Sequence, residues 1–408
     1  MQTDPANRNT STRQDNPVWR VFLIFLRLGL TSFGGPVAHL GYFREEFVSK
    51  RKWLSESSYA DLVALCQFLP GPASSLVGLG LGLSCRGIPG ALAAWAGFTL
   101  PSAVALILFA MGISTWGDAL PAGILQGLKL VAVAVVAQAV WGMARSLCPD
   151  ALRLTLAILV AGVVLWLPGP WIQVAVLAAA GLAGLFLFPS MPSATHETLP
   201  IRIGKPVALG ALGLFLSLLL GLPLLAAAME CPVMDRIDSF YRAGSLVFGG
   251  GHVVLPLLQS EVVPPGWISN ETFMAGYGAA QAVPGPLFTF AAYLGASMTS
   301  APSGWWGGLI CLLAVFAPSI LLVVGALPFW DTLRRLNHVR AALTGVNAAV
   351  VGLLLAALYH PVWTSAVHGA GDFVLALAAF AALMYWKLPP WLVVLACAAA
   401  GWVVRLLQ

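Results

Sequence analysis

The chain has 408 residues, of which 59% are hydrophobic and only 9% are charged, and its formal net charge is +5. This balance excludes an ordinary soluble globular protein, in which about a quarter of the residues are charged. Recurrent apolar runs of about 18 residues or more predict membrane-spanning helices, because a helix satisfies its own backbone polar groups in lipid. The sequence therefore predicts an all-α polytopic membrane protein, and its basic residues fit membrane-flanking loops without any nucleic-acid partner.

The first elements in chain order are a polar tail, residues 1–20, and an apolar run that contains RLGLTSFGGP (27–36). The tail carries Arg8, Arg13 and Arg20 and shows no cleavable signal peptide, so we expect a cytoplasmic N-terminus. In RLGLTSFGGP an arginine precedes a helix break made of two glycines and a proline. A basic loop (44–57) and a second break, PGP at 70–72, follow.

The middle of the chain holds Lys129, which lies too deep in an apolar run for an ordinary loop residue, and one long polar stretch at about 189–206. One further apolar run, 207–229, precedes the second half. We divide the chain into the tail, an N-terminal transporter repeat (21–188), a linker with one inverting helix (189–239) and a C-terminal transporter repeat (240–408).

The second half repeats the landmarks of the first half in the same order. Arg242, the FGG at 248–250 and Glu261 follow Arg27, the FGG at 33–35 and Glu46 at an offset of 215 residues. QAVPGP (281–286) follows QFLPGP (67–72) at an offset of 214 residues. The Pro-Ser pair at 318–319 matches the one at 101–102, and Asn347 takes the place of Lys129. This ordered series indicates a duplication.

A single unmatched span between two copies with equal numbers of crossings predicts that the copies are inverted, as in many secondary transporters. Loop charge agrees, because Lys50, Arg51 and Lys52 have no basic counterpart after the second FGG. The same rule favours about nine full spans plus four re-entrant hairpins at the FGG and PGP breaks. The alternative is about thirteen full spans. Re-entrant backbone is tolerated where it faces protein or a cavity.

Charged residues inside a membrane cost at least a few kcal/mol, so Arg27, Arg242 and Lys129 are candidate substrate-binding residues. The two arginines lie at the same distance before their breaks, which favours a paired anion site; the alternative is that they snorkel to an interface. Each break leaves a half-helix whose free N–H groups suit an anion, unless glycine and proline merely permit close packing. The residues predicted for these breaks are Gly34, Gly35, Gly71, Gly249, Gly250, Gly285, Pro36, Pro70, Pro72, Pro284 and Pro286.

Neutral polar side chains complete the predicted site. Gln67, Gln281 and Asn347 are candidates to hydrogen-bond an oxyanion, or else to bond neighbouring helices. Glu46, Glu261 and His252 are candidates for coupling transport to protons, with solvated or capping roles as the alternative for the two acids. His39 also follows a break, but it does not align with His252.

Enzyme motifs are missing from the sequence. It contains no HExxH, GxSxG, P-loop or CxxC pattern, and its six cysteines are scattered singly. GAGD (369–372) is similar to the motif of intramembrane aspartyl proteases but lacks a second membrane aspartate. We therefore expect a transporter rather than an enzyme, with no cofactor and no metal.

The ordered motifs resemble those of the chromate ion transporter family in its long, two-domain form. The resemblance covers residues 20–404 and rests on FLRLGLTSFGGP, WLSE and FLPGP, on FGGGHVVLPLL, GWIS and QAVPGP, and on Gly-Leu-Lys at 127–129. It implies a bacterial inner-membrane secondary transporter that exports chromate and confers resistance, with sulfate as a competitor. Many members carry an acidic residue after the first PGP, whereas this chain reads ASSLVGLGLG, which puts proton coupling at that position in doubt.

Other functions stay open at this point. A transporter or a passive channel for another oxyanion such as sulfate would share the cationic cavity, although inverted broken helices favour alternating access. Export of a dianion from a cell that is negative inside gains about 4.6 kcal/mol per 100 mV. The sequence does not decide between uniport and proton coupling, or between a monomer and a homodimer.

Overall fold

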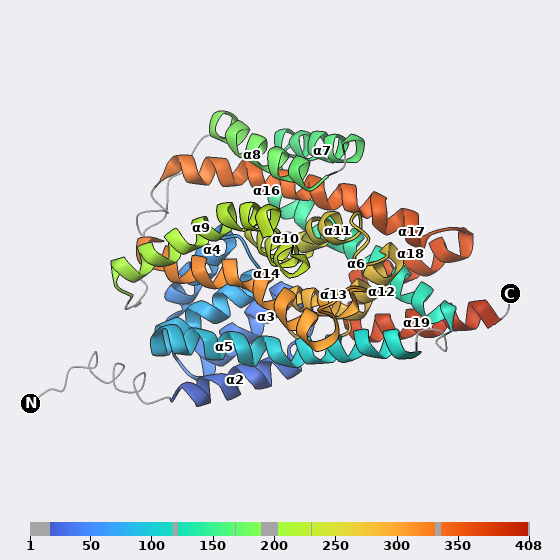
Figure 1. The fold of residues 1–408 in the computed structure, drawn as a ribbon, viewed down its shortest axis with the longest axis horizontal. Helices are drawn as coiled ribbons and strands as arrows, with labels where there is room; N and C mark the ends of the chain where they lie inside the picture. The colour runs from blue at the N-terminus through green and yellow to red at the C-terminus, as the bar shows by residue number, and fades with distance from the viewer. Residues whose placement is uncertain are drawn as a thin grey trace, which may run out of the picture.

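In the computed structural model, residues 17–116, 121–167, 169–188, 203–229, 231–330 and 336–406 are described, and within these ranges the chain forms helices and no strand. The predicted all-α fold is confirmed. Arg8 and Arg13 of the tail and most of the polar stretch 189–206 lie outside the described residues. In Figure 1, α16 runs along the molecule with α7 and α8 packed on one side, while α2 and α5 lie side by side at the opposite edge.

The first half supplies eight of the labelled segments. These are α2 (Val18–Thr31), α3 (Gly35–Phe43), the π-helical η2 (Arg44–Lys50), α4 (Glu56–Phe68), α5 (Ala73–Trp116), α6 (Ala122–Leu147), α7 (Ala151–Trp166) and α8 (Pro170–Leu187). The run that separates the halves forms α9 (Lys205–Met229). α5 is kinked at Arg86 and Gly87, whose backbone angles are not helical.

The second half is more finely divided. Its segments are α10 (Pro232–Leu246), η4 (Gly251–Val253), α11 (Val254–Val262), α12 (Asn270–Ala280), η5 (Leu287–Thr289), α13 (Phe290–Ser297), α14 (Gly304–Ala326), η6 (Leu327–Phe329), α16 (Asn337–Ala357), η7 (Leu358–Trp363), α17 (Thr364–Ala366), α18 (Ala370–Met384) and α19 (Pro390–Leu406). By the repeat alignment, α10, α12, α14 and α16 correspond to α2, α4, the second part of α5 and α6.

The helices break where the sequence places glycine and proline. α2 ends at Thr31, and Gly34 and Gly35 then adopt φ of +101° and +77°, a conformation that glycine reaches without a steric penalty. Pro36 occupies the first turn of α3, where its missing N–H leaves no hydrogen bond unmade. In the second half, Gly249 is at φ +74° after α10 ends. The predicted breaks at both FGG motifs are thus present.

The WLSE and GWIS motifs are helix N-caps. The Ser55 hydroxyl accepts a hydrogen bond from the Ser58 backbone N–H at the start of α4, at 3.1 Å. Ser269, at the equivalent position, accepts one from the Thr272 N–H at the start of α12, also at 3.1 Å. A serine side chain at this position satisfies an N–H that lacks a partner within the helix. The two motifs therefore fix where α4 and α12 begin after each loop.

The helices include six that are long and apolar enough to cross a membrane, within the described ranges. They are Ala73–Thr115, Gly123–Leu147, Pro170–Leu187, Lys205–Met229, Gly304–Phe329 and Asn337–Ala366. Four shorter apolar helices accompany them: Ala151–Trp166, Leu287–Ser297, Ala370–Met384 and Pro390–Val403. The multi-pass membrane character is confirmed, whereas the number of full spans and the inverted orientation of the halves stay predictions.

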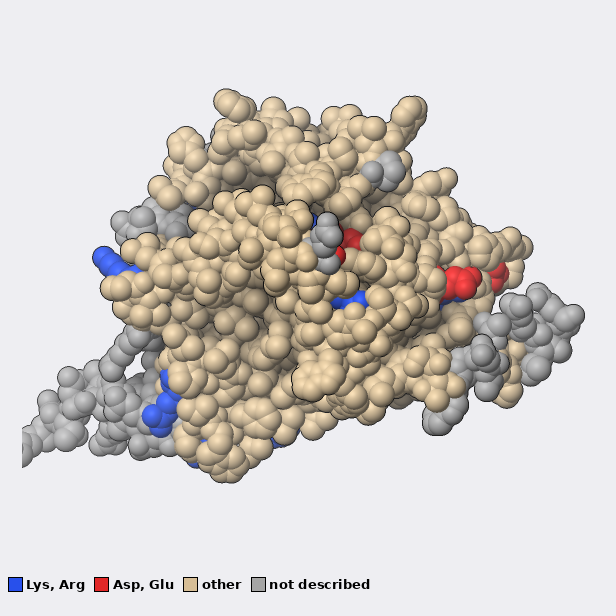
Figure 2. Space-filling model, viewed as in Figure 1, with Lys and Arg blue, Asp and Glu red and all other residues tan. Residues whose placement is uncertain are grey.

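The outer surface is apolar, as contact with lipid requires. Figure 2 shows few charged side chains on the visible face. Trp166 and Phe186 are 88% and 86% exposed. In α9 only 17% of the most apolar stretch is buried, so this helix lies at the periphery. Exposed apolar area on this scale marks a surface that another apolar phase covers.

Small residues let the buried helices approach one another closely. A Cβ on Gly244 of α10 would overlap the Val315 carbonyl of α14, and one on Gly127 of α6 would overlap the Cys397 carbonyl of α19. Such contacts replace the hydrophobic driving force that helices lack inside lipid, because close backbones gain van der Waals contact.

Candidate anion site

Two hydrogen bonds between the halves tie the helix breaks together. The Gly71 N–H donates to the Val247 carbonyl at 2.7 Å, and the Gly285 N–H donates to the Ser32 carbonyl at 3.0 Å. Gly71 and Gly285 are equivalent positions of the repeat, as are Ser32 and Val247. Each PGP break is therefore bonded to the segment that enters the FGG break of the other half. We call this pair the crossed hydrogen bonds.

The same local symmetry extends to two buried serines. A Cβ on Gly71, at φ +127°, would overlap the Ser319 hydroxyl, and one on Gly285, at φ +102°, would lie 2.9 Å from the Ser102 hydroxyl. Both serines follow the paired prolines of the repeat and are fully buried. The glycine in each PGP is thus required by its backbone angle and by the close approach of a serine. The flanking residues Pro70, Pro72, Pro284 and Pro286 hold the same turns.

A cavity of about 80 Å³ lies among the breaks. Its lining residues come from the first FGG segment and α3, from α6, from η4 just after the second FGG, from the end of α12 through the second PGP segment to η5, and from the start of α19. They are Gly34, Gly35, Pro36, His39, Val135, Gln138, His252, Ala280, Gln281, Val283, Gly285, Leu287 and Pro390. About 10–15 Å³ admits one water, so this cavity has room for a small ion. We call it the central cavity.

The described lining of the central cavity contains no Lys, Arg, Asp or Glu. Its polarity comes from two histidines, two glutamines and the ends of helices. Three helical segments begin here. α3 begins at Gly35, η5 begins at Leu287 and continues into α13, and η4, which contains His252, continues into α11. The N-terminal end of a helix presents free N–H groups and the positive end of its dipole. The cavity is therefore suited to a small anion rather than to a cation.

The two histidines reach the cavity from different halves. The His39 Nε2 lies 3.2 Å from the Ser32 carbonyl, and its ring packs edge-on against Phe98, with centroids 5.3 Å apart. The His252 Nδ1 lies 2.7 Å from the Tyr277 hydroxyl. The position equivalent to His252 is Val37, so sequence alignment alone did not bring these histidines together.

Arg242 is neutralised by two carboxylates. Its guanidinium donates to Glu261 through Nε at 3.1 Å and Nη2 at 2.8 Å, and to Asp238 through Nη1 at 2.7 Å. The Trp171 ring lies 5.1 Å from the guanidinium carbon. This bidentate arrangement is the strong form of a charge-assisted pair. Arg242 does not line the central cavity.

The equivalent residues of the first half are arranged differently. Arg27 is exposed on α2, and Glu46 pairs with Arg51 at 2.8 Å. The position equivalent to Asp238 is Leu23, so the first half lacks the second carboxylate. The structure does not bring Arg27 and Arg242 together in one cavity, and a role of either in binding stays a prediction.

The remaining predicted residues are spread around the centre. Lys129 is buried, and its Nζ lies 4.0 Å from the carboxylate of Glu271, whose side chain is exposed. Asn347 lies beside the second FGG, since a Cβ on Gly249 would be 3.5 Å from its Oδ1, and Gly250 lies near Met143. Gln281 lines the central cavity, whereas Gln67 is exposed at the end of α4.

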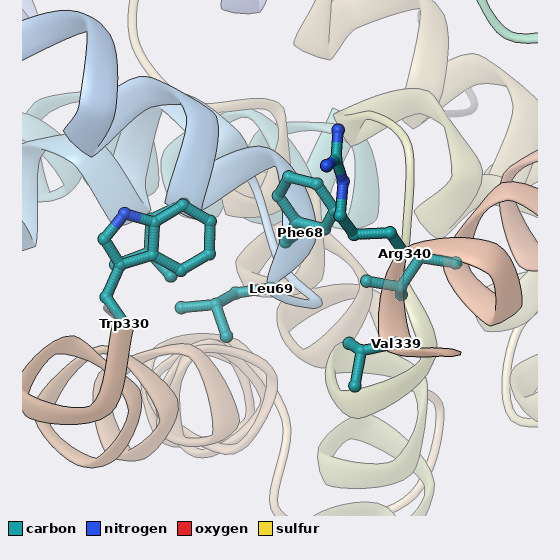
Figure 3. A pocket seen from close by; sticks show the side chains of 7 residues that line it. Phe68, Leu69, Trp330, Val339 and Arg340 are labelled. Carbon is teal, nitrogen blue, oxygen red and sulfur yellow. The ribbon is translucent and has the colours of Figure 1, made fainter. Parts of the chain in front are cut away.

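A second, apolar cavity of about 160 Å³ separates α4 from the start of α16 (Figure 3). It is lined by Leu65, Phe68, Leu69, Trp330, Val339, Arg340 and Leu343, and the guanidinium of Arg340 points away from Leu69 and Val339. The equivalent helices α12 and α6 are in direct contact, because a Cβ on Gly278 would overlap the Leu128 carbonyl. The pair α12 and α6 is thus in contact, whereas the equivalent pair α4 and α16 is separated by a cavity.

Known proteins are similar to this chain over most of its length. The sequence model of a family described as Chromate transporter matches residues 19–185 and again residues 234–402. The chain is 30% identical to a chromate transport protein of Pseudomonas aeruginosa over 403 residues, which cover 94% of this chain and 92% of that protein. It is 26% identical to a probable chromate transport protein of Synechococcus elongatus, over 92% of this chain and 93% of that one.

A shorter relative matches less of the chain. An uncharacterized transporter of Bacillus subtilis is 30% identical over 175 residues, which are 42% of this chain and 86% of that protein. No solved structure matches significantly.

Proposed function

Because this chain belongs to the chromate transporter family, we propose that it exports chromate from a bacterial cell through the central cavity and so confers resistance to chromate. The family resemblance seen in the motifs is confirmed by the matches in both halves. Similarity to a chromate transport protein over nearly the full length supports the substrate. We place the chain in the inner membrane by analogy with its family, and its N-terminus in the cytoplasm on the loop charges.

The observation that carries the binding site is the central cavity next to the crossed hydrogen bonds. A dianion that crosses a membrane needs a positive potential, but a site with full cations would hold it too tightly for release. Helix ends, glutamine amides and histidines supply partial positive charge with directional donors. Arg27 and Lys129 are candidates for drawing the anion towards the cavity, whereas the charge of Arg242 is offset by its two carboxylate partners.

The unequal helix pairs support transport by alternating access. α12 contacts α6 directly, while α4 and α16 are separated by the apolar cavity. Exchange of these two arrangements would open the central cavity first to one side and then to the other. Export of a dianion from a cell that is negative inside is favoured by about 4.6 kcal/mol per 100 mV. Sulfate, with the same charge and shape, is the expected competitor.

The test is chromate uptake into inverted membrane vesicles from cells that express the protein. Respiring inverted vesicles are positive inside, so export in the cell becomes uptake in the vesicle. We expect uptake that saturates and that an ionophore abolishes. Uptake of sulfate but not of chromate would instead assign the protein to another oxyanion.

Two glutamines give matched variants for this assay. Gln281→Met removes an amide from the central cavity, whereas Gln67→Met changes an exposed amide at the equivalent position of the other half. A hydrogen bond to a charged ligand contributes about 1.5–3 kcal/mol, so we expect Gln281→Met to weaken uptake about tenfold or more. Gln67→Met should leave it unchanged. Equal losses in the two variants at normal expression would remove the central cavity as the binding site.

A further inference from the structure

We propose that the central cavity binds a tetrahedral oxyanion together with one proton, and that His39 holds this proton. The inference rests on the proposed oxyanion transport and adds its proton stoichiometry, so that the exported complex carries one negative charge and gains half the electrical energy of a bare dianion. It depends on which nitrogen of each histidine carries a hydrogen. The carbonyl partner of His39 determines this for its ring, whereas the hydroxyl partner of His252 fits either neutral form.

The partner of His39 fixes its neutral form. The Ser32 carbonyl has no hydrogen to give, so the His39 Nε2, at 3.2 Å, must be the donor of that hydrogen bond. The neutral ring then has a bare lone pair on Nδ1. This atom is buried, His39 is only 1% exposed, and Nδ1 has no hydrogen-bond partner among the described residues. His39 thus lines the cavity with a basic nitrogen, Nδ1, to which no described group donates a hydrogen bond.

The partner of His252 allows this ring to take the opposite form. Tyr277 is fully buried, and its hydroxyl reaches the His252 Nδ1 at 2.7 Å. When this hydroxyl donates to Nδ1, the neutral ring carries its hydrogen on Nε2. The His252 Nε2 then gives the cavity a donor that one oxygen of an oxyanion accepts. In this form His252 donates to the anion without gaining a proton, whereas His39 must gain a proton before its Nδ1 can donate.

The surroundings of His39 favour a proton only when an anion is present. Phe98 faces its ring from α5, Gln138 lies on α6, and Gln281 precedes the second PGP break. His252, backed by Tyr277, is the other titratable group along the described lining of the cavity. In an empty cavity, burial favours the neutral ring. A bound oxyanion favours the charged ring, which converts Nδ1 from an acceptor into a donor. Anion and proton therefore bind cooperatively.

The experiment measures the pH dependence of anion affinity on the purified full chain in detergent, by calorimetry. Sulfate is the main probe because it stays fully ionised near neutral pH, so that any proton taken up belongs to the protein. Chromate is measured in parallel. For one proton bound with each anion, the apparent Kd should rise about tenfold per pH unit between pH 6 and pH 7.5.

Two variants separate the roles of the histidines. In His39→Gln, the amide nitrogen can still donate to the Ser32 carbonyl but cannot titrate, so the apparent Kd should lose its dependence on pH. His252→Gln keeps a donor and keeps His39, so it should retain the tenfold dependence. His39→Asn provides a second non-titrating variant in case the first one fails to fold, as judged by gel filtration.

Each outcome decides one of the two proposals. Wild-type protein that binds neither chromate nor sulfate would overturn the proposed function. Binding without pH dependence, the same dependence in His39→Gln as in wild type, or chromate binding with no sulfate binding down to pH 6 would overturn the assignment of the proton to His39 and leave the function intact.

Discussion

The glycine of the first PGP break provides the sharpest test of the crossed arrangement. In Gly71→Ala, the new Cβ must occupy a residue at φ +127° and would overlap the Ser319 hydroxyl. The same residue donates its N–H to the Val247 carbonyl, so any shift that relieves the overlap also strains a hydrogen bond between the halves.

The cost has two separable parts. A residue with a side chain held at such a backbone angle costs about 1–3 kcal/mol. Forcing a methyl group into a filled core costs a further 1–3 kcal/mol or so, which brings the total to about 2–6 kcal/mol. Ser319→Ala in the same chain removes the overlapping oxygen, which leaves the Ser319 Cβ at 3.3 Å, and should recover most of the second part. Ser319→Ala alone should be nearly neutral, because its hydroxyl is buried with no partner among the described residues.

The assay is thermal unfolding in detergent, followed by the loss of the monodisperse peak in gel filtration. Gly87→Ala is the matched control, since Gly87 also has a positive φ of +62° but has nothing within 4 Å of a new Cβ. We expect stability to fall in the order wild type, Gly87→Ala, the double variant and Gly71→Ala. Equal stability of Gly71→Ala and Gly87→Ala, or no recovery in the double variant, would refute the contact with Ser319.

Three further predictions concern stability and use the same assay. Arg242→Met leaves two buried carboxylates without their cation and should cost about 3–5 kcal/mol, whereas Arg27→Gln, on an exposed site, should change stability by less than about 0.5 kcal/mol; similar losses would contradict the buried ion pairs. Ser55→Ala and Ser269→Ala each remove an N-cap and should cost about 1 kcal/mol; a loss in one of them alone would show that the caps are not equivalent. Glu271→Gln breaks a pair with one exposed partner and should cost less than about 0.5 kcal/mol, and a larger loss would mean that this carboxylate is more buried than described.

Local features of this fold were predictable from sequence. The FGG break follows from glycines that reach positive φ and from a proline that starts the next helix, and these properties are read one residue at a time. The duplication follows from the order of such landmarks. The triad around Arg242 was partly predictable, because Asp238 precedes it by one helical turn, at the spacing of an intrahelical ion pair. The repeat alignment does not reveal this neighbour, because the equivalent position is Leu23.

The centre of the molecule could not be predicted in the same way. His39 and His252 stand at positions that do not correspond in the repeat, and only the folding of both segments onto one cavity brings them together. Ser102 and Ser319 were visible as repeated landmarks, but their contact with the PGP glycines is made over more than 180 residues. No periodicity or spacing encodes such a distance. The exposure of Arg27 likewise depends on which face of α2 packs against α5.

Because of the crossed hydrogen bonds, each half depends on the other half for hydrogen-bond partners at its helix breaks. A chain that held one such half would present a carbonyl after its first helix and a glycine N–H in its PGP break, each needing the other from a second molecule. Two identical molecules could close this arrangement, but every residue at the centre would then occur twice. Joining the halves in one chain releases that constraint, so the two copies evolve separately. Lys129, which is equivalent to Asn347, and Asp238, which is equivalent to Leu23, are differences that two identical molecules could not carry.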